Sequence, residues 1–186
     1  MPPNDNRIDA RDWSLLAVLS ILWGGSFFFN GAGLRELPPL TLVFLRVALG
    51  AAVLLPLLHV QGISFPQGTL GWKPFFVIGL LNNVIPFSLI VIGQTIIPSG
   101  LASILNATTP LFTVTVMAMA GEEALQMRRV AGVVLGVVGV VILRGWGIET
   151  RPGQGFGILL CLGGACSYGF AALAARRLLK DSAPLG

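Results

Sequence analysis

The residues of this sequence best suited to binding a ligand are polar side chains set within long apolar runs. Trp23, Ser26 and Asn30 recur at a spacing that places them on one face of a helix. Polar groups are costly in lipid, so they face either a partner helix or a water-filled cavity. Both interpretations remain open for each residue. The candidate cavity residues are Trp23, Ser26, Asn30, Asn83, Gln94, Asn106 and Tyr168.

Two prolines add weight to the asparagine positions. A proline within a helix removes the hydrogen bond to the carbonyl four residues earlier. Pro86 therefore frees the carbonyl of Asn82, and Pro110 frees that of Asn106. Broken helices persist at membrane depth where they are buried in protein or line a wet cavity. We predict hinges beside ligand-facing acceptors at Pro86 and Pro110, with a simple packing kink as the alternative.

Arg46 is the one charged residue within residues 39–58. Its side chain could extend to the membrane surface, pair with another group inside the helix bundle, or meet an anionic substrate. Structural pairing within the bundle is the favoured interpretation.

The sequence shows no catalytic arrangement. It has one histidine, His59, and no phosphate-binding loop or nucleophile beside a base. Cys161 and Cys166 point in different directions on one helix, so we expect neither a disulfide nor a metal site. An intramembrane enzyme is disfavoured because the apolar segments lack His, Asp and Glu. We predict that the protein is not an enzyme and uses no metal or cofactor.

The composition indicates which elements position these side chains. Of 186 residues, 54% are hydrophobic and 11% are charged, whereas a soluble domain carries about 25% charged residues. A helix needs roughly 20 apolar residues to cross a bilayer, and the uncharged run 74–120 is long enough for two crossings if it breaks near 94–100. The sequence predicts an all-α membrane protein with six helices, at 14–34, 39–58, 74–95, 99–120, 128–146 and 155–175.

The positions of the basic residues predict the orientation of these helices. The net charge of +4 lies at the ends of apolar segments, so we expect contact with membrane lipid and none with nucleic acid. Placing the N-terminus inside puts most Lys and Arg residues on the cytoplasmic side, as the positive-inside rule requires. Residues 1–13 are then a cytoplasmic tail.

The first and sixth predicted helices show a weak internal repeat. Trp23-Gly24 aligns with Tyr168-Gly169, and Pro39-Leu40 aligns with Pro184-Leu185. The unit is five helices, and an odd number inverts the second copy in the membrane, as in many secondary transporters. Residues 14–146 would be the first repeat and 147–186 the start of the second. We therefore expect a fragment or truncated product whose cavity needs a second copy or a missing half.

Several segments resemble EamA-type transporters of the drug/metabolite transporter superfamily. They are LWGGSF at 22–27, FLR at 44–46, PSGLASILNATTPLF at 98–112 and the pair Gly121-Glu122. The resemblance implies a bacterial inner-membrane protein of two inverted five-helix repeats around a central substrate cavity. It also implies a structural role for Glu122, capping or pairing at the end of a helix.

These observations favour a secondary transporter of small organic solutes, exporting an amino acid, metabolite or drug by alternating access. The alternative is a non-transporting membrane scaffold or an inactive fragment.

Overall fold

The computed structural model describes residues 9–62, 68–123, 127–144 and 152–180, and every regular element within these ranges is helical. The predicted all-α fold is therefore confirmed. The elements are α1 (Ala10–Gly33), α2 (Pro39–Val60), α3 (Gly68–Gly79), the π-helix η1 (Leu80–Val84), α4 (Ile85–Gln94), α5 (Ser99–Asn106), α6 (Thr109–Met119), α7 (Met127–Arg144) and α8 (Gln154–Leu178).

Within the described residues, five helical segments are long and apolar enough to cross a membrane. They are Ala10–Gly33, Pro39–Val60, Leu70–Gln94, Ser99–Met119 and Gln154–Leu178. The remaining predicted span, 128–146, corresponds to α7, which has 18 residues and carries arginine near both of its ends. Its apolar centre is correspondingly short, and Trp146 lies outside the described residues.

The first helix starts earlier than hydropathy predicts. Asp9 caps α1 by accepting a hydrogen bond from the backbone of Ala10, and Asp12 accepts one from the backbone of Asp9. Such a capping box satisfies backbone donors at a helix start. A charged first turn therefore extends α1 beyond the apolar run on which the prediction was based.

Two of the membrane-length segments are interrupted. The third consists of α3, η1 and α4, with Pro86 two residues after the π-helix. The fourth consists of α5 and α6, which are separated by Ala107 and Thr108 and have Pro110 at the start of α6. The predicted break in the 74–120 run is present between Gln94 and Ser99.

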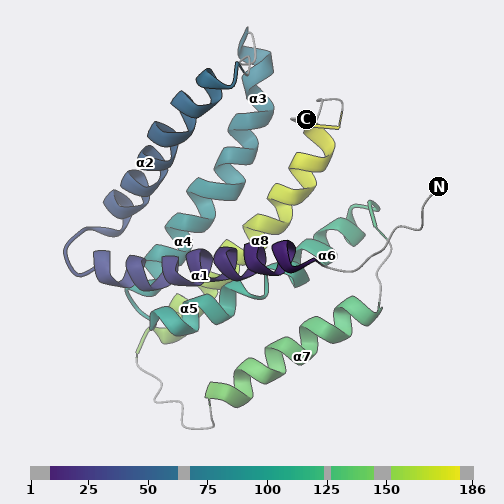
Figure 1. Cartoon of the computed structure of the whole chain (residues 1–186). Helices are drawn as coiled ribbons and strands as arrows, with labels where there is room; N and C mark the ends of the chain where they lie inside the picture. The colour runs from purple at the N-terminus through teal and green to yellow at the C-terminus, as the bar shows by residue number, and fades with distance from the viewer. Residues whose placement is uncertain (1–8, 63–67, 124–126, 145–151, 181–186) are drawn as a thin grey trace.

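Helix α8 is the central packing element. It packs most extensively against α4 and α6, and also contacts α3 and α5. In Figure 1, α2, α3, α4 and α8 run in roughly the same direction, while α1 lies across them. Glycine allows the closest approaches: a Cβ atom at Gly164 would lie 2.9 Å from Ile90 Cγ1, and one at Gly169 would lie 3.0 Å from the carbonyl oxygen of Phe112.

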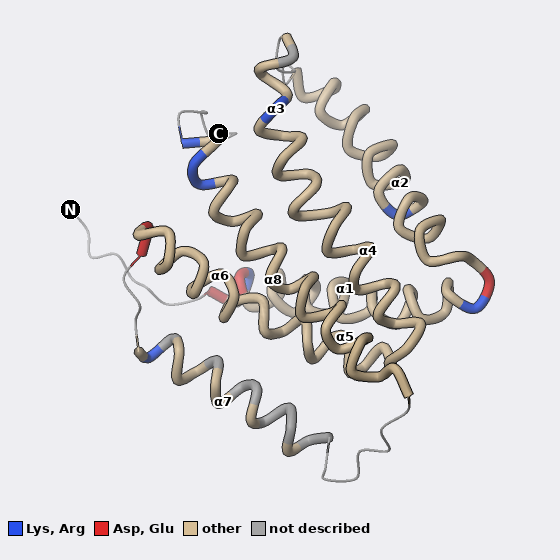
Figure 2. Tube along the Cα trace, turned by 180° about the vertical axis from the view of Figure 1, so that it is seen from behind, with Lys and Arg blue, Asp and Glu red and all other residues tan. Residues whose placement is uncertain are grey.

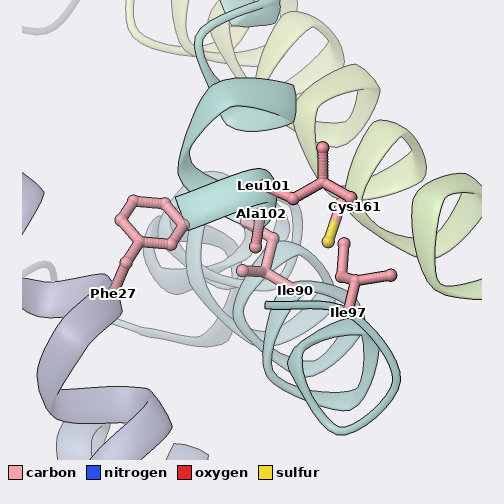
Figure 3. Close-up of a cluster of buried hydrophobic side chains, with 6 residues drawn as sticks. All are labelled: Phe27, Ile90, Ile97, Leu101, Ala102 and Cys161. Atoms are coloured by element: carbon pink, nitrogen blue, oxygen red, sulfur yellow. The ribbon is translucent and has the colours of Figure 1, made fainter. Parts of the chain in front are cut away.

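A small apolar core joins α1, α4, α5 and α8. Phe27 reaches from α1 toward α5, and Cys161 of α8 directs its sulfur toward Ile97 (Figure 3). Its buried members are Phe27, Ile90, Ile97, Leu101, Ala102 and Cys161. Cys161 and Cys166 are both free thiols.

Charged residues lie mainly at the helix ends, with further basic positions inside α2 and α3 (Figure 2). Two acidic residues after α6 meet two basic residues near the end of α8. Glu122 lies 2.8 Å from Arg177 and 3.4 Å from Arg176, and Glu123 lies 3.2 Å from Arg176. Arg177 also donates to the carbonyl of Ala120, so this cluster ties the end of α6 to the end of α8.

The Glu122 contacts predict a pH dependence of stability. The hydrogen bond from Arg177 holds the pKa of Glu122 below its ordinary value of 4.5. A lowered folded-state pKa stabilises the fold above the unfolded-state value, and this stabilisation is lost as pH falls through the folded-state value. In melting curves between pH 7 and pH 3, the wild type should therefore lose stability below about pH 4.5 more steeply than Glu122→Gln.

Arg177→Gln removes the donor while keeping Glu122, and provides the matched test. It should flatten the same part of the pH profile as Glu122→Gln. Identical pH slopes in the wild type and both variants would show that the pair contributes nothing to stability.

Candidate functional site

Four helices bring polar residues from distant parts of the chain to one small cavity, and a fifth helix, α4, adds apolar lining. The cavity has a volume of about 20 Å³, which is room for about one water molecule. Its lining comes from α1, α2, α4, α5 and α8, and consists of Trp23, Ser26, Phe27, Asn30, Arg46, Phe87, Ile90, Val91, Asn106 and Tyr168. Five of the seven candidate residues therefore share one site.

Gln94 lies next to this site and organises one side of it. Its Oε1 accepts a hydrogen bond from Asn30 Nδ2 at 3.2 Å. Its Nε2 donates to the carbonyl of Phe27 at 3.0 Å and to Ser99 Oγ at 2.9 Å. Gln94 and Asn30 are both buried, so the end of α4 holds α1 and α5 together and fixes the orientation of the Asn30 amide.

Asn83 lies in a different place. It lines an apolar groove with Val47 of α2 and with Trp72 and Phe76 of α3. On a regular helix Asn83 and Gln94 are nearly in line, but the π-helix between Leu80 and Val84 changes the rotation per residue. The structure therefore does not bring Asn83 to the cavity.

The hydroxyl groups of the fourth segment mostly bond to their own helix. Ser103 Oγ donates to the carbonyl of Gly100, and Thr113 Oγ1 donates to that of Thr109. Thr109 Oγ1 donates at 2.7 Å to the carbonyl of Asn106, the group left without its helical donor by Pro110. The backbone acceptor predicted there is thus occupied by a side chain of the same segment.

The side chain of Asn106 is the unsatisfied group in the cavity. Asn106 is 7% exposed, and its Oδ1 atom has no hydrogen-bond partner among the described residues. An unpaired buried polar atom costs about 1–3 kcal/mol, and most such atoms in folded proteins are paired. Asn106 is the last residue of α5, so the helix break presents this amide at the cavity.

Arg46 enters the same cavity from α2. Its guanidinium carbon lies 4.1 Å from the centre of the Phe87 ring of α4, a cation–π contact. Within the described ranges, no Asp or Glu side chain forms an ion pair with Arg46. The structure thus brings Arg46, which the sequence assigned to structural pairing, into the cavity lining.

The aromatic and aliphatic lining from α4 is absent from the candidate residues predicted from the sequence. Phe87, Ile90 and Gln94 recur at spacings of three and four, which places them on one face of a helix. Extending the face of Gln94 back by two turns would have found Phe87. Among the described residues, no group of three or more His, Cys, Asp and Glu side chains is placed to hold a metal ion.

The site can hold a small polar or charged group between an arginine, two amides and a tyrosine. It offers a fixed positive charge, an acceptor without a donor and an aromatic wall. Pro86 and Pro110 are near lining residues in the sequence. Pro86 directly precedes Phe87, and Pro110 follows Asn106 by four residues. They remain candidate hinges.

Comparison with known proteins shows the family. The EamA-like transporter family matches residues 12–145. The "Uncharacterized inner membrane transporter YedA" of Escherichia coli K12 is 28% identical over 167 residues, which is 88% of this chain and 52% of the relative. The "Uncharacterized transporter YvbV" of Bacillus subtilis is 29% identical over 158 residues, covering 83% and 50%.

A relative from Salmonella typhimurium carries a more specific name. It is called a "Probable amino-acid metabolite efflux pump" and is 26% identical over 182 residues, covering 92% of this chain and 56% of the relative. The chain thus spans about half the length of these curated relatives. No solved structure matches it. With its membrane-length apolar helices, the chain is a multi-pass membrane protein, and it belongs to the EamA-like transporter family.

Proposed function

We propose that this chain is a secondary transporter of small organic solutes, and that the cavity between α1, α2, α4, α5 and α8 is its solute pathway. The observation that carries the proposal is the convergence of Arg46, Asn106 and Tyr168 on one cavity within apolar helices. Polar groups in this setting mark solute or ion pathways in membrane proteins. Relatives named as transporters support the same conclusion.

The size of the cavity supports alternating access. A cavity of about 20 Å³ holds about one water molecule, so a solute enters only when the helices separate. Irregular backbone flanks the cavity at the π-helix Leu80–Val84 and at the break between α5 and α6. Broken helices are where transporter helices bend around their substrate, which fits Pro86 and Pro110 as hinges.

The setting of the transporter follows from the same family. One relative is named an inner membrane transporter, which supports a bacterial inner membrane as the location. The distribution of Lys and Arg favours a cytoplasmic N-terminus. The name of another relative favours amino acids or related metabolites as solutes. Residues 14–146 would form one five-helix repeat and 147–186 the start of an inverted one, with a second copy or another half completing the pathway.

Flux measurements test this proposal directly. The purified chain is placed in lipid vesicles, and uptake of labelled alanine, lactate, glycerol and a lipophilic dye is compared with uptake by protein-free vesicles. We expect protein-dependent flux of at least one of these solutes. Equal rates with and without protein for the whole set would overturn the proposal.

Asn106→Ala should reduce that flux. Loss of one hydrogen-bonding group in contact with the solute corresponds to about a two- to tenfold loss of rate at low solute concentration. Asn82→Ala removes an amide from the exposed side of the π-helix and serves as the control, with flux like the wild type at equal protein in the vesicles. Unchanged flux in Asn106→Ala would leave Asn106 a packing residue.

A further inference from the structure

The positive charge of Arg46 lies in the cavity without a counter-charge from the described residues. The described acidic residues are Asp9, Asp12, Glu36, Glu122 and Glu123, and all lie in caps, first turns or connections. Among the described residues, Glu122 and Glu123 form ion pairs with Arg176 and Arg177 of α8. A charge inside a membrane protein is costly unless it is paired. An anionic group bound beside Arg46 would therefore be stabilised.

The contact with Phe87 leaves the hydrogen-bonding capacity of Arg46 unused. A guanidinium group has five N–H donors, and a contact with the face of a ring satisfies the charge in part but pairs none of these donors with an acceptor. Within the described ranges, no hydrogen bond joins Arg46 to a protein acceptor. A planar fork of this kind matches a carboxylate, which it binds through two parallel hydrogen bonds.

The other polar groups of the lining restrict the chemical class of the ligand further. Asn30 is already held by Gln94, and Ser26 donates to the carbonyl of Trp23. Asn106 is left with an unpaired Oδ1 atom. This acceptor requires a donor, such as a hydroxyl or ammonium group, on the molecule that occupies the cavity.

We propose that Arg46 and Asn106 form a subsite for a small carboxylate that carries a hydrogen-bond donor next to its carboxyl group. The proposal rests on the proposed function and names the solute class of the same cavity. The guanidinium of Arg46 donates hydrogen bonds to the carboxylate of the ligand. The Oδ1 atom of Asn106 accepts a hydrogen bond from the neighbouring hydroxyl or ammonium group of the ligand. The ligand supplies the negative charge that the described membrane segments lack.

The position of Arg46 on α2 suggests an entry route for the ligand between α2 and α4. Helix α2 makes its main contacts with α4 alone, and it lies at the edge of the bundle in Figures 1 and 2. A displacement of α2 from α4 would separate Arg46 from Phe87 and enlarge the cavity. A carboxylate bound to Arg46 would take the place of the ring contact during this movement.

Binding to the purified full chain in lipid nanodiscs tests the subsite. Lactate and its neutral analogue lactamide have the same shape but differ in charge, and propionate lacks the hydroxyl donor. We expect lactate to raise the melting temperature in a concentration-dependent way, propionate to do so more weakly, and lactamide to have no effect. Equal effects of lactate and lactamide would overturn the proposal.

Substitutions then assign the effect to Arg46. Arg46→Gln should weaken lactate binding about tenfold or more, because a charge-assisted hydrogen bond is lost. Arg46→Lys keeps the charge without the fork and should bind with intermediate affinity. Arg35→Gln removes an exposed charge from the turn after α1 and should bind lactate like the wild type.

The same variants separate a ligand site from a structural one. If Arg46 pairs with a ligand, Arg46→Gln should melt at or above the wild-type temperature without lactate, because an unpaired charge has been removed. A lower melting temperature without lactate, together with unchanged lactate binding by the folded fraction, would make Arg46 structural. If the protein transports glycerol but does not bind lactate, the carboxylate subsite is overturned and the proposed transport function stands. If the protein binds lactate but transports none of the solutes, the proposed transport function is overturned and the subsite stands.

Discussion

Replacing Gly169 by leucine should force α8 away from α6 and strongly destabilise the fold. A Cβ atom at Gly169 would lie 3.0 Å from both the carbonyl carbon and the carbonyl oxygen of Phe112, and 3.2 Å from the backbone nitrogen of Thr113. These neighbours are backbone atoms, which cannot move aside as a side chain can. Overpacking costs about 1–3 kcal/mol and occasionally more, and we expect the upper end here.

Gly155→Leu is the matched control for this substitution. It introduces the same side chain into the same helix, at a position where a Cβ atom would meet nothing within 4 Å. Melting temperatures of both variants in detergent should show a large loss for Gly169→Leu and little change for Gly155→Leu. Similar melting temperatures would mean that α8 and α6 do not approach as closely as the structure shows.

Gln94→Leu should produce a loss of comparable size by a different mechanism. It removes three hydrogen bonds to Asn30, Phe27 and Ser99. Each interhelical hydrogen bond in a membrane protein contributes about 0.6 kcal/mol on average, and a buried amide left unpaired costs about 1–3 kcal/mol more. We expect a total loss of about 3–5 kcal/mol in the free energy of unfolding.

A double substitution shows whether the unpaired amide causes this loss. In Asn30→Leu/Gln94→Leu both partners are apolar, so the double variant should be less destabilised than the two single losses together imply, by about 1 kcal/mol. Thr95→Ala alters a neighbouring exposed residue whose hydroxyl bonds its own helix, and should be close to the wild type. Strict additivity of the two leucine substitutions would argue against the Asn30–Gln94 contact.

Much of the fold could be predicted because hydropathy and charge act over whole segments. The uncharged runs and their breaks located the helices, and the spacing of Trp23, Ser26 and Asn30 predicted a shared polar face on α1. The start of α1 was less accessible, because a capping box depends on two aspartates outside the apolar run. The π-helix was also not predicted, and its altered rotation is what separates Asn83 from the line of Gln94.

Most residues of the candidate site could be predicted from the sequence, but the contacts between them could not. Helical spacing finds residues on one face of one helix, but it does not say which faces of different helices meet. The sequence predicts pairing of Arg46 within the bundle but does not identify its partner, because Phe87 comes from α4 and is distant in the sequence. The hydrogen bond between Asn30 and Gln94 could likewise be recognised only from the placement of α1 beside α4.

The joint between α5 and α6 carries its own hydrogen-bond donors. Thr108 Oγ1 donates at 2.6 Å to the carbonyl of Leu105, and Thr109 Oγ1 donates at 2.7 Å to that of Asn106. A carbonyl exposed by bending in a lipid environment would otherwise cost several kcal/mol. These hydroxyls belong to the joint itself, so a bend at this position would keep a hydrogen-bond donor beside each of the two carbonyls. The proposed hinge at Pro110 would then move without the cost of leaving those carbonyls unpaired in hydrocarbon.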